Sequence, residues 1–183
     1  CRREVKDTPV AIRLLKRYVG DMALAVKIAQ PQKAAALNKK IAIIGAGPAG
    51  LTAAYYLVLQ GYDCVIFDDR EKAGGMLRYG VAPARLPVDV LDAELASVLS
   101  VGIDYRPGVC VGRDISLAQL RQDFDAVVLA TGNQSGDAPD IDGEKMQTNL
   151  HGGTQWPDVF AAGAIIRPTH HAVRAVGEGQ AVT

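Results

Sequence analysis

The chain has 183 residues, of which 49% are hydrophobic and 22% charged, a composition typical of a soluble globular domain, alone or with an appendage. It carries 20 basic and 20 acidic residues, so nothing in its charge indicates a nucleic-acid or membrane partner. No apolar run approaches the roughly 18 residues of a membrane span, and the three widely spaced cysteines favour a reduced, cytoplasmic setting. Because the chain starts at Cys1 rather than Met and ends within a helical segment, we expect a piece of a longer polypeptide.

Residues 1–36 are predicted to form a helix and a linker that lie outside the main domain. Thr8 and Pro9 are typical of the N-cap and first position of a helix. Apolar residues then recur every four positions, which predicts an amphipathic helix to about Ile28; these residues are Val10, Leu14, Tyr18 and Met22. Residues 29–39 are typical of a linker.

Residues 37–183 alternate between apolar strands and helices. Strands are predicted at 40–45, 64–68, 103–107, 125–132 and 158–163, and helices at 48–61, 87–102, 116–122 and 170–182. The first strand is continuously apolar, as expected of a strand buried on both faces of a parallel sheet. The alternation predicts an α/β fold with a doubly wound, Rossmann-like parallel sheet.

A glycine fingerprint, Gly45-x-Gly47-x-x-Gly50, lies where the first strand passes into the first helix. The first glycine allows a tight turn, the second lets the backbone approach a pyrophosphate, and the third lets the helix pack against the strand. Asp68 ends the next strand 23 residues after Gly45, where its carboxylate can accept hydrogen bonds from a ribose diol. This strand–turn–helix context favours a dinucleotide site over a loop whose glycines serve only packing.

Three further stretches favour FAD over NAD as the dinucleotide. Gly74 and Gly75 leave room for a ligand, and the Thr131-Gly132 turn ends a late strand with backbone that can approach a pyrophosphate. The segment 157–163 ends in small residues before a helix, whose N-terminus suits negative charge on a reduced flavin. A single NAD(H) site remains open as the alternative.

Together these residues resemble the flavin domain of the glutamate synthase small-subunit family, which has relatives in dihydropyrimidine dehydrogenase and other iron–sulfur flavoproteins. The resemblance covers nearly the whole chain and is most specific at 45–57, 74–87, 111–120, 124–132 and 158–163. It implies FAD as the cofactor and a redox or iron–sulfur subunit or domain as the partner. NADPH and iron–sulfur clusters belong to the intact parent only, and no side chain is implied to act as a catalytic acid or base.

The resemblance also implies which residues hold FAD. The pyrophosphate would lie on Gly45, Gly47, Pro48, Ala49 and Gly50, and the adenosine ribose on Asp68. The path toward the flavin would be lined by Gly75, Met76 and Leu77, with Arg85 near it, while the backbone of Val111 would meet the adenine. The phosphate side would be packed by Ala130, Thr131 and Gly132, and the ribityl chain would lie by Gly163 and Ala164.

Three departures from the family pattern limit this expectation. Ala164 replaces an Asp that hydrogen-bonds a ribityl hydroxyl, a loss of about 1–2 kcal/mol in binding. The family inserts a complete NADPH-binding domain where this chain has a short seam at 133–145, without a second glycine fingerprint. Cys1 alone remains of a cluster motif, and one thiolate cannot hold a four-iron cluster. The sequence therefore predicts FAD binding without NADPH-driven turnover, and a structural or assembly module that binds FAD poorly stays open.

The remaining chemistry-bearing residues are predicted to be structural. Cys64 and Cys110 are expected to be small core residues rather than redox thiols. His170 and His171 start the last helix without convergent partners for a metal, and Trp156 is expected to pack across a turn.

Overall fold

The computed structural model describes residues 2–26, 31–132, 148–149, 151–168 and 171–183, and the chain divides into two compact units, Cys1–Gln30 and Pro31–Thr183. The predicted seam at 133–145, together with Cys1 and His170, lies outside the described residues. Among the helices that the structure describes, none is long and apolar enough to cross a membrane.

The first unit contains a short 3-10 helix, η1 (Arg2–Val5), and the helix α1 (Ile12–Ala25). The predicted helix start at Thr8 and Pro9 is wrong. The carbonyl of Val10 accepts the N–H of Ile12 in a tight turn, which interrupts the helical path before α1 begins. The predicted end at Ile28 is also too late, because Val26 has already returned to extended backbone.

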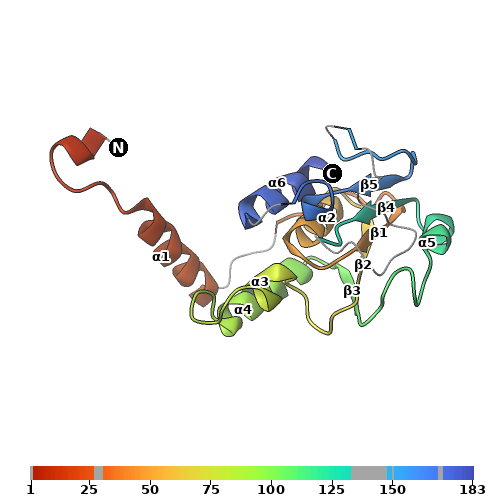
Figure 1. Ribbon diagram of the computed structural model, residues 1–183, viewed down its shortest axis with the longest axis horizontal. Coiled ribbons are helices and arrows are strands. Elements are labelled where there is room, and N and C mark those ends of the chain that lie inside the picture. Colours follow the sequence, from red (N-terminus) through yellow and green to blue (C-terminus); the bar gives the residue numbers. More distant parts are fainter. Residues whose placement is uncertain (1, 27–30, 133–147, 150, 169–170) are drawn as a thin grey trace. The chain divides into compact units, whose positions relative to one another are not determined.

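The second unit is built on a five-stranded sheet in which every pairing is parallel (Figure 1). Its strands lie in the order β3-β2-β1-β4-β5. Their bounds are β1 (Lys40–Ile44), β2 (Asp63–Asp68), β3 (Asp104–Pro107), β4 (Ala126–Leu129) and β5 (Val159–Ala161). The order reverses between β1 and β4, and ligands of doubly wound folds bind outside the carboxyl ends of the strands at such a switch point. The predicted fold is confirmed.

Helices cover both faces of this sheet (Figure 1). They are α2 (Pro48–Leu59), α3 (Met76–Tyr79), α4 (Val88–Leu99), α5 (Leu117–Asp123), the 3-10 helix η2 (Gly163–Ile165) and α6 (Ala172–Ala181). Both α4 and α6 contact α2, whereas α5 packs beneath β4 on the opposite face. The sequence did not predict α3 and η2, because four and three residues are too few to show a helical period.

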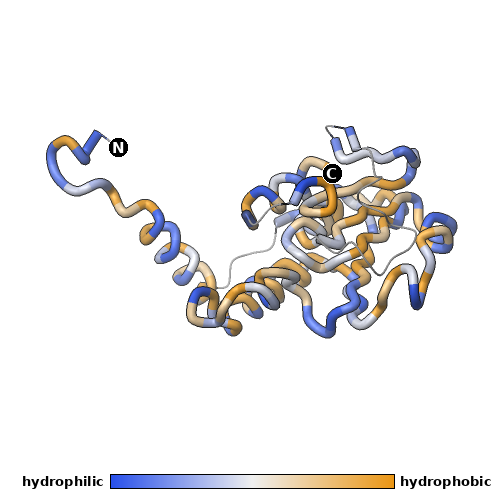
Figure 2. Tube along the Cα trace, in the orientation of Figure 1, coloured by the Kyte–Doolittle hydropathy of each residue, from blue (hydrophilic) through white to orange (hydrophobic). Residues whose placement is uncertain are grey.

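Alternate residues of the strands enter one of two cores, one on each face of the sheet. Ile41 and Ile43 of β1 pack in the core that α2 and α4 cover, and Ala42 and Ile44 pack in the core that α5 covers. In Figure 2 these central strands are mostly orange, the colour of hydrophobic residues. Burial on both faces explains why β1 is apolar at consecutive positions.

Two predicted helix boundaries rest on identifiable residues. Gly61 follows the C-cap residue of α2 with φ +96°, the left-handed conformation that favours glycine. The Ser116 hydroxyl accepts the N–H of Gln119 at 3.1 Å and so caps α5, as predicted. The predicted helix at 87–102 is shorter than expected, since α4 covers Val88–Leu99.

Candidate functional site

The loop after β1 makes its turn against the end of β4. Gly45 has φ +105°, and a Cβ on it would lie 2.4 Å from the carbonyl oxygen of Ala130. Its N–H donates to the carbonyl of Phe67 at 2.7 Å, which ties the loop to β2. No residue with a side chain fits at this position. The glycine thus brings the Ala130–Thr131 turn next to the fingerprint loop.

Gly50 lets the first turn of α2 lie on this loop. A Cβ on Gly50 would lie 2.0 Å from the carbonyl oxygen of Gly45, closer than two such atoms can approach. This is the packing predicted for the third glycine. The helix therefore begins directly above the strand end, and its first N–H groups point out of the loop without partners in the helix.

Gly47 differs from the other two fingerprint glycines, Gly45 and Gly50, because no described residue crowds the position of a Cβ on it. Its backbone is extended, at φ −80° and ψ 179°, and among the described residues the atom nearest to a Cβ there is the Cα of Gly75, 4.0 Å away. Gly75 has φ +50°, a conformation that favours glycine, and a Cβ on it would lie 2.8 Å from the Cα of Gly47. The Gly74 N–H donates to the carbonyl of Ala46 at 2.8 Å. The two glycine segments thus meet at an open space beside Gly47, bounded by Gly75 and the start of α2, which we call the cradle.

Small residues also contact the start of α2 from the elements that follow β5. A Cβ on Gly163 would lie 2.8 Å from the Cβ of Ala49, and one on Gly179 would lie 2.3 Å from the carbonyl oxygen of Ala49. Gly163 begins η2 and Gly179 lies in α6, so both elements reach the first turn of α2. Sequence reasoning missed Gly179, and its place inside a helix was no sufficient signal, because Gly177 in the same helix has no described atom within 4 Å of a Cβ.

Asp68 lies at the carboxyl end of β2 and is buried, with 9% of its surface exposed. Its Oδ2 accepts the N–H of Ala46 at 2.5 Å, and its Oδ1 accepts the N–H of Arg70 at 2.8 Å. Burial raises the pKa of this carboxyl above its ordinary value, and the two backbone hydrogen bonds oppose that rise. Each oxygen keeps a further lone pair, so the carboxylate has acceptor capacity for ligand hydroxyls. The donors Ala46 and Arg70 were not predicted.

The segment that contains Val111 runs beside Asp68. The N–H of Val109 donates to the backbone carbonyl of Asp68 at 2.9 Å, and the N–H of Gly108 donates to the carbonyl of Arg70 at 3.2 Å. Val111 follows, buried, and forms a bridge with Ile115. The structure therefore brings the backbone before Val111 to the same strand end as the acidic residue.

At the end of β4, the turn at residues 130–132 contains an unpaired hydroxyl. Ala130 is fixed by its N–H, which donates to the carbonyl of Ile44 at 2.8 Å. The Oγ1 of Thr131 is buried and has no hydrogen-bond partner among the described residues. Gly132 has φ +76°, and no atom of the described residues lies within 4 Å of where a Cβ would stand. An unpaired buried hydroxyl beside the fingerprint loop fits a polar ligand.

Four other predicted site residues make no contact with the Gly45–Gly50 loop that the described residues show; these are Met76, Leu77, Arg85 and Ala164. Met76 is 70% exposed, whereas Leu77 packs partly against the core under α2 and α4. Arg85 is exposed in a turn that its N–H closes on the carbonyl of Ala82. Ala164 lies half-buried in η2.

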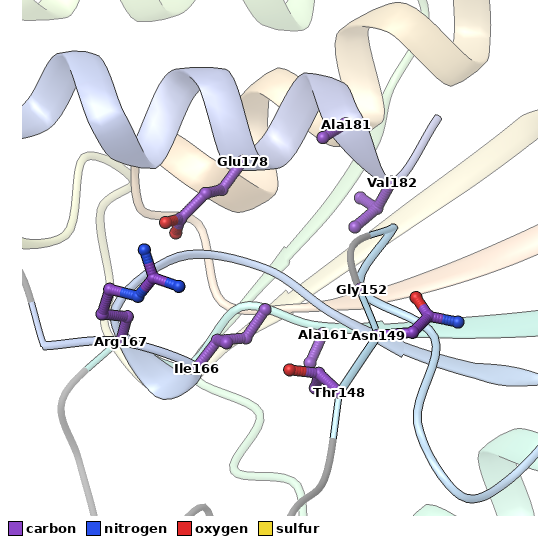
Figure 3. A pocket seen from close by; sticks show the side chains of 9 residues that line it. All are labelled: Thr148, Asn149, Gly152, Ala161, Ile166, Arg167, Glu178, Ala181 and Val182. Carbon is purple, nitrogen blue, oxygen red and sulfur yellow. The ribbon is translucent and has the colours of Figure 1, made fainter.

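A pocket of about 520 Å³ lies between β5, η2, α6 and the segment before β5, and Figure 3 shows the residues that line it. The Glu178 and Arg167 side chains point toward one another there. The Glu178 Oε2 is buried without a hydrogen-bond partner in the described part of the chain. The pocket includes none of the predicted cofactor residues.

The structure describes the surroundings of Cys64, Cys110 and Trp156. Cys64 is buried in β2, as predicted for a core residue, and burial raises the pKa of its thiol to about 12. Cys110 is half-buried in the loop before Val111. Trp156 packs under the Arg121 guanidinium, which lies 5.8 Å from the ring centre.

A family model described as an NAD(P)-binding Rossmann-like domain matches residues 43–94, which include the end of β1, the fingerprint loop, α2 and β2. Over 147 residues, the chain is 42% identical to the NADPH-Fe(3+) oxidoreductase subunit beta of Geobacter sulfurreducens, a match that covers 79% of this chain and 22% of that protein. It is 39% identical over 133 residues to the glutamate synthase [NADPH] small chain of Mycobacterium tuberculosis, covering 72% of this chain and 27% of that one.

Among solved structures, the chain resembles that of THI4 from Thermovibrio ammonificans with a TM-score of 0.52 and 17% identity, over 79% of this chain and 86% of that one. This likeness concerns the fold alone. The sequence relatives confirm the resemblance to the glutamate synthase small subunit, and the chain spans only about a quarter of their length. Residues 43–94 therefore match an NAD(P)-binding Rossmann-like domain, and the chain is homologous to part of oxidoreductase subunits such as the glutamate synthase small chain.

Proposed function

We propose that residues 37–183 bind FAD as an electron-transferring domain of a larger oxidoreductase. The observation that carries the proposal is the open cradle at Gly47, bounded by Gly75 and the start of α2, at the switch point of the sheet. A diphosphate is the group that such a cradle and a helix N-terminus suit best. Among the described residues, the nearest atom to a Cβ on Gly47 is the Cα of Gly75 at 4.0 Å, whereas a Cβ on Gly45 or Gly50 would clash with backbone.

The surrounding residues fit the rest of an FAD molecule. Asp68 would accept the adenosine ribose hydroxyls, with the backbone near Val111 beside the adenine. Pro48, Ala49 and Gly50 would face the pyrophosphate, and the buried Thr131 hydroxyl would gain the partner that it lacks among the described residues. Ala130 and Gly132 would pack on the phosphate side of the cofactor. The remaining proposed contacts lie toward the flavin; these are Gly75, Met76, Leu77 and Arg85 along the path, and Gly163 and Ala164 by the ribityl chain. FAD supplies the redox chemistry when bound, and the protein supplies binding and orientation.

The organisation of the parent protein belongs to the same proposal. Relatives named as a subunit or small chain of redox enzymes support a redox partner subunit, which we infer to carry iron–sulfur clusters. Residues 1–36 would lead from an iron–sulfur domain, and residues 133–145 would mark the place of a missing NADPH domain. A cytoplasmic location agrees with this assignment. We expect no NADPH-driven turnover from this chain by itself.

The test is to purify the 183-residue chain, record its absorbance in the flavin bands, and titrate the ligand-free protein with FAD by calorimetry. We expect one FAD per chain with micromolar or tighter affinity. Colourless protein that cannot be reconstituted with FAD would contradict the proposal and leave a structural or assembly module as the better description.

A second candidate ligand is NAD(H), which the description of the matching family model favours. Both dinucleotides share the adenosine diphosphate that the loop and Asp68 suit. Competition between FAD and NADH for the chain separates the two, because NADH displaces FAD at comparable concentration only if the site is not specific for flavin.

A further inference from the structure

The loop that bounds the cradle after β2 is tied to the fingerprint loop by a backbone hydrogen bond. The Gly74 N–H donates to the carbonyl of Ala46 at 2.8 Å, and a Cβ on Gly75 would lie 2.8 Å from the Cα of Gly47. One hydrogen bond adds little net stability, because it replaces bonds that both groups would make to water. Contacts from other elements are therefore needed to keep residues 73–75 in this position.

Arg78, in α3, holds the loop from its other side. Its Nε–H donates to the carbonyl of Ala73 at 2.7 Å, directly before the two glycines. Its Nη2 donates to the Oδ1 of Asp92 in α4. The Arg78 side chain is only 10% exposed, whereas that of Asp92 is 48% exposed. Because hydrogen bonds from a charged donor are stronger than neutral ones, this guanidinium forms a firm link between the loop and α4.

The helix α3 is too short to fix Arg78 without help. It has four residues, and a single helical turn is not stable by itself. It contacts α4 (Figure 1), and the ion pair with Asp92 spans that contact. Gly74 lies against α4 as well, since a Cβ on it would lie 3.4 Å from Leu91 Cδ2 and 3.5 Å from Leu95 Cδ1. Both leucines are buried in the core, so α4 is the firm support to which the loop is attached.

We infer that Arg78 is a positioning residue of the nucleotide site, which holds the Gly74–Gly75 loop against the fingerprint loop through its links to Ala73 and Asp92. The inference rests on the proposed binding of FAD at the cradle, and it adds the side chain that keeps the cradle in its binding form. Arg78 need not touch the ligand, because these two links use its Nε and Nη2. A loop that occupies the binding form for a smaller fraction of time lowers the apparent affinity in proportion.

Arg78→Gln tests the effect on binding. We expect the dissociation constant of FAD, measured by calorimetry on the full chain, to rise about 10-fold, the factor that corresponds to one lost charged hydrogen bond. Arg121→Gln is the matched control, because Arg121 also pairs with an aspartate, Asp158, but directly before β5 and away from the cradle loop. It should lower the midpoint of urea denaturation and leave the affinity for FAD unchanged. A purely structural role of Arg78 would give the same result as this control.

Asp92→Asn tests whether Asp92 acts through Arg78. Alone, it should raise the dissociation constant of FAD about 3-fold, because the amide oxygen still accepts a hydrogen bond while the charge is lost. Combined with Arg78→Gln it should add nothing, as expected of two residues that act through one contact. A factor for Asp92→Asn that multiplies fully with that of Arg78→Gln overturns the link from α4 to the loop.

Hydrogen exchange reports on the loop without any ligand. The Gly74 amide of the wild type should be protected by its hydrogen bond to Ala46. Arg78→Gln should speed its exchange at least about 10-fold, whereas the Ala130 amide, which donates to the end of β1, keeps its rate. Equal exchange at Gly74 in the wild type and Arg78→Gln overturns the inference, and so does an unchanged affinity for FAD.

These outcomes keep the inference apart from the proposed function. A wild type that binds no FAD contradicts the proposed function, while faster exchange at Gly74 in Arg78→Gln still supports Arg78 as the residue that positions the loop. A wild type and Arg78→Gln that bind FAD equally well support the proposed function and overturn the inference.

Discussion

The segment from β1 to β2 and the segment around β4 and β5 contribute to one candidate site in opposite ways. The first holds the fingerprint loop, the start of α2 and the buried Asp68, each fixed by close contacts of backbone or by hydrogen bonds. The second contributes mainly small residues that pack on the first, through Ala130 against Gly45 and Gly163 against Ala49. On the proposed function, the first segment would carry recognition of the nucleotide, and the second would shape and support the site.

The largest expected effect comes from Gly50→Ala, which places a Cβ within 2.0 Å of the Gly45 carbonyl oxygen. Backbone must move to relieve this contact, so we expect a loss of about 3 kcal/mol in the free energy of unfolding. Urea denaturation of the purified variant measures it. A variant as stable as the wild type would show that α2 does not depend on this close approach.

Gly177→Ala is the matched control for that substitution. Gly177 lies in α6 with nothing within 4 Å of a Cβ, so the methyl group meets no clash. We expect a gain of about 0.5–1 kcal/mol, because alanine has the higher helix propensity. A loss at both glycines would mean that the effect at Gly50 is a general one of glycine replacement.

Asp68 should make the free energy of unfolding depend on pH. Burial raises its pKa in the folded chain, so its contribution to stability is fully present below the ordinary carboxyl pKa and is lost as the pH rises through the folded-state pKa. Relative to Asp68→Asn, which does not titrate, the wild type should gain stability as the pH is lowered from 7 toward 3. Denaturation of both proteins across this range measures the trend, and a difference independent of pH would contradict it.

The contribution of Asp158 to stability should change with pH in the opposite direction from that of Asp68. Its Oδ2 accepts the Arg121 Nε–H at 2.7 Å and its Oδ1 accepts from the second guanidinium nitrogen at 2.8 Å, which links α5 to the turn before β5. The hydrogen bond from Arg121 lowers the pKa of Asp158, so this contribution is present above the ordinary carboxyl pKa and is lost as the pH falls.

The wild type should therefore exceed Asp158→Asn in stability at pH 7, by the smallest margin of these predictions, because the pair is partly exposed. The difference should close in acid. A margin that widened as the pH fell would show that Arg121 does not stabilise the ionised carboxylate.

The two segments also differ in how well the sequence predicts them. The glycine spacing and the acid after β2 are local signals with one structural meaning, so the loop, α2 and Asp68 follow from the sequence. The contact of Gly179 with Ala49 joins residues far apart in the chain, and no local pattern specifies that pairing. The same holds for the hydrogen bonds from Ala46 and Arg70 that fix the Asp68 carboxylate.

The sequence also predicted short elements and helix starts poorly. Neither α3 nor η2 is long enough to show a period. Gly75 precedes α3 and Gly163 begins η2, and both have a positive φ that depends on their neighbours. The start of α1 was misplaced because Thr8 and Pro9 match a capping pattern, whereas the turn at Val10 decides the boundary. A capping pattern shows where a helix is able to begin, and the backbone contacts of the folded chain determine where it does.

The most direct test of the account compares thermal unfolding of the wild type and Gly47→Ala, each with and without FAD. A Cβ at Gly47 meets only ordinary contact with Gly75, so the variant should fold with stability within about 1 kcal/mol of the wild type. FAD at about 100 times its dissociation constant should stabilise the wild type by about 2.7 kcal/mol and leave the variant unchanged. An equal rise in melting temperature for both proteins, or no rise for either, would contradict the assignment of the cradle at Gly47 as the place where the nucleotide binds.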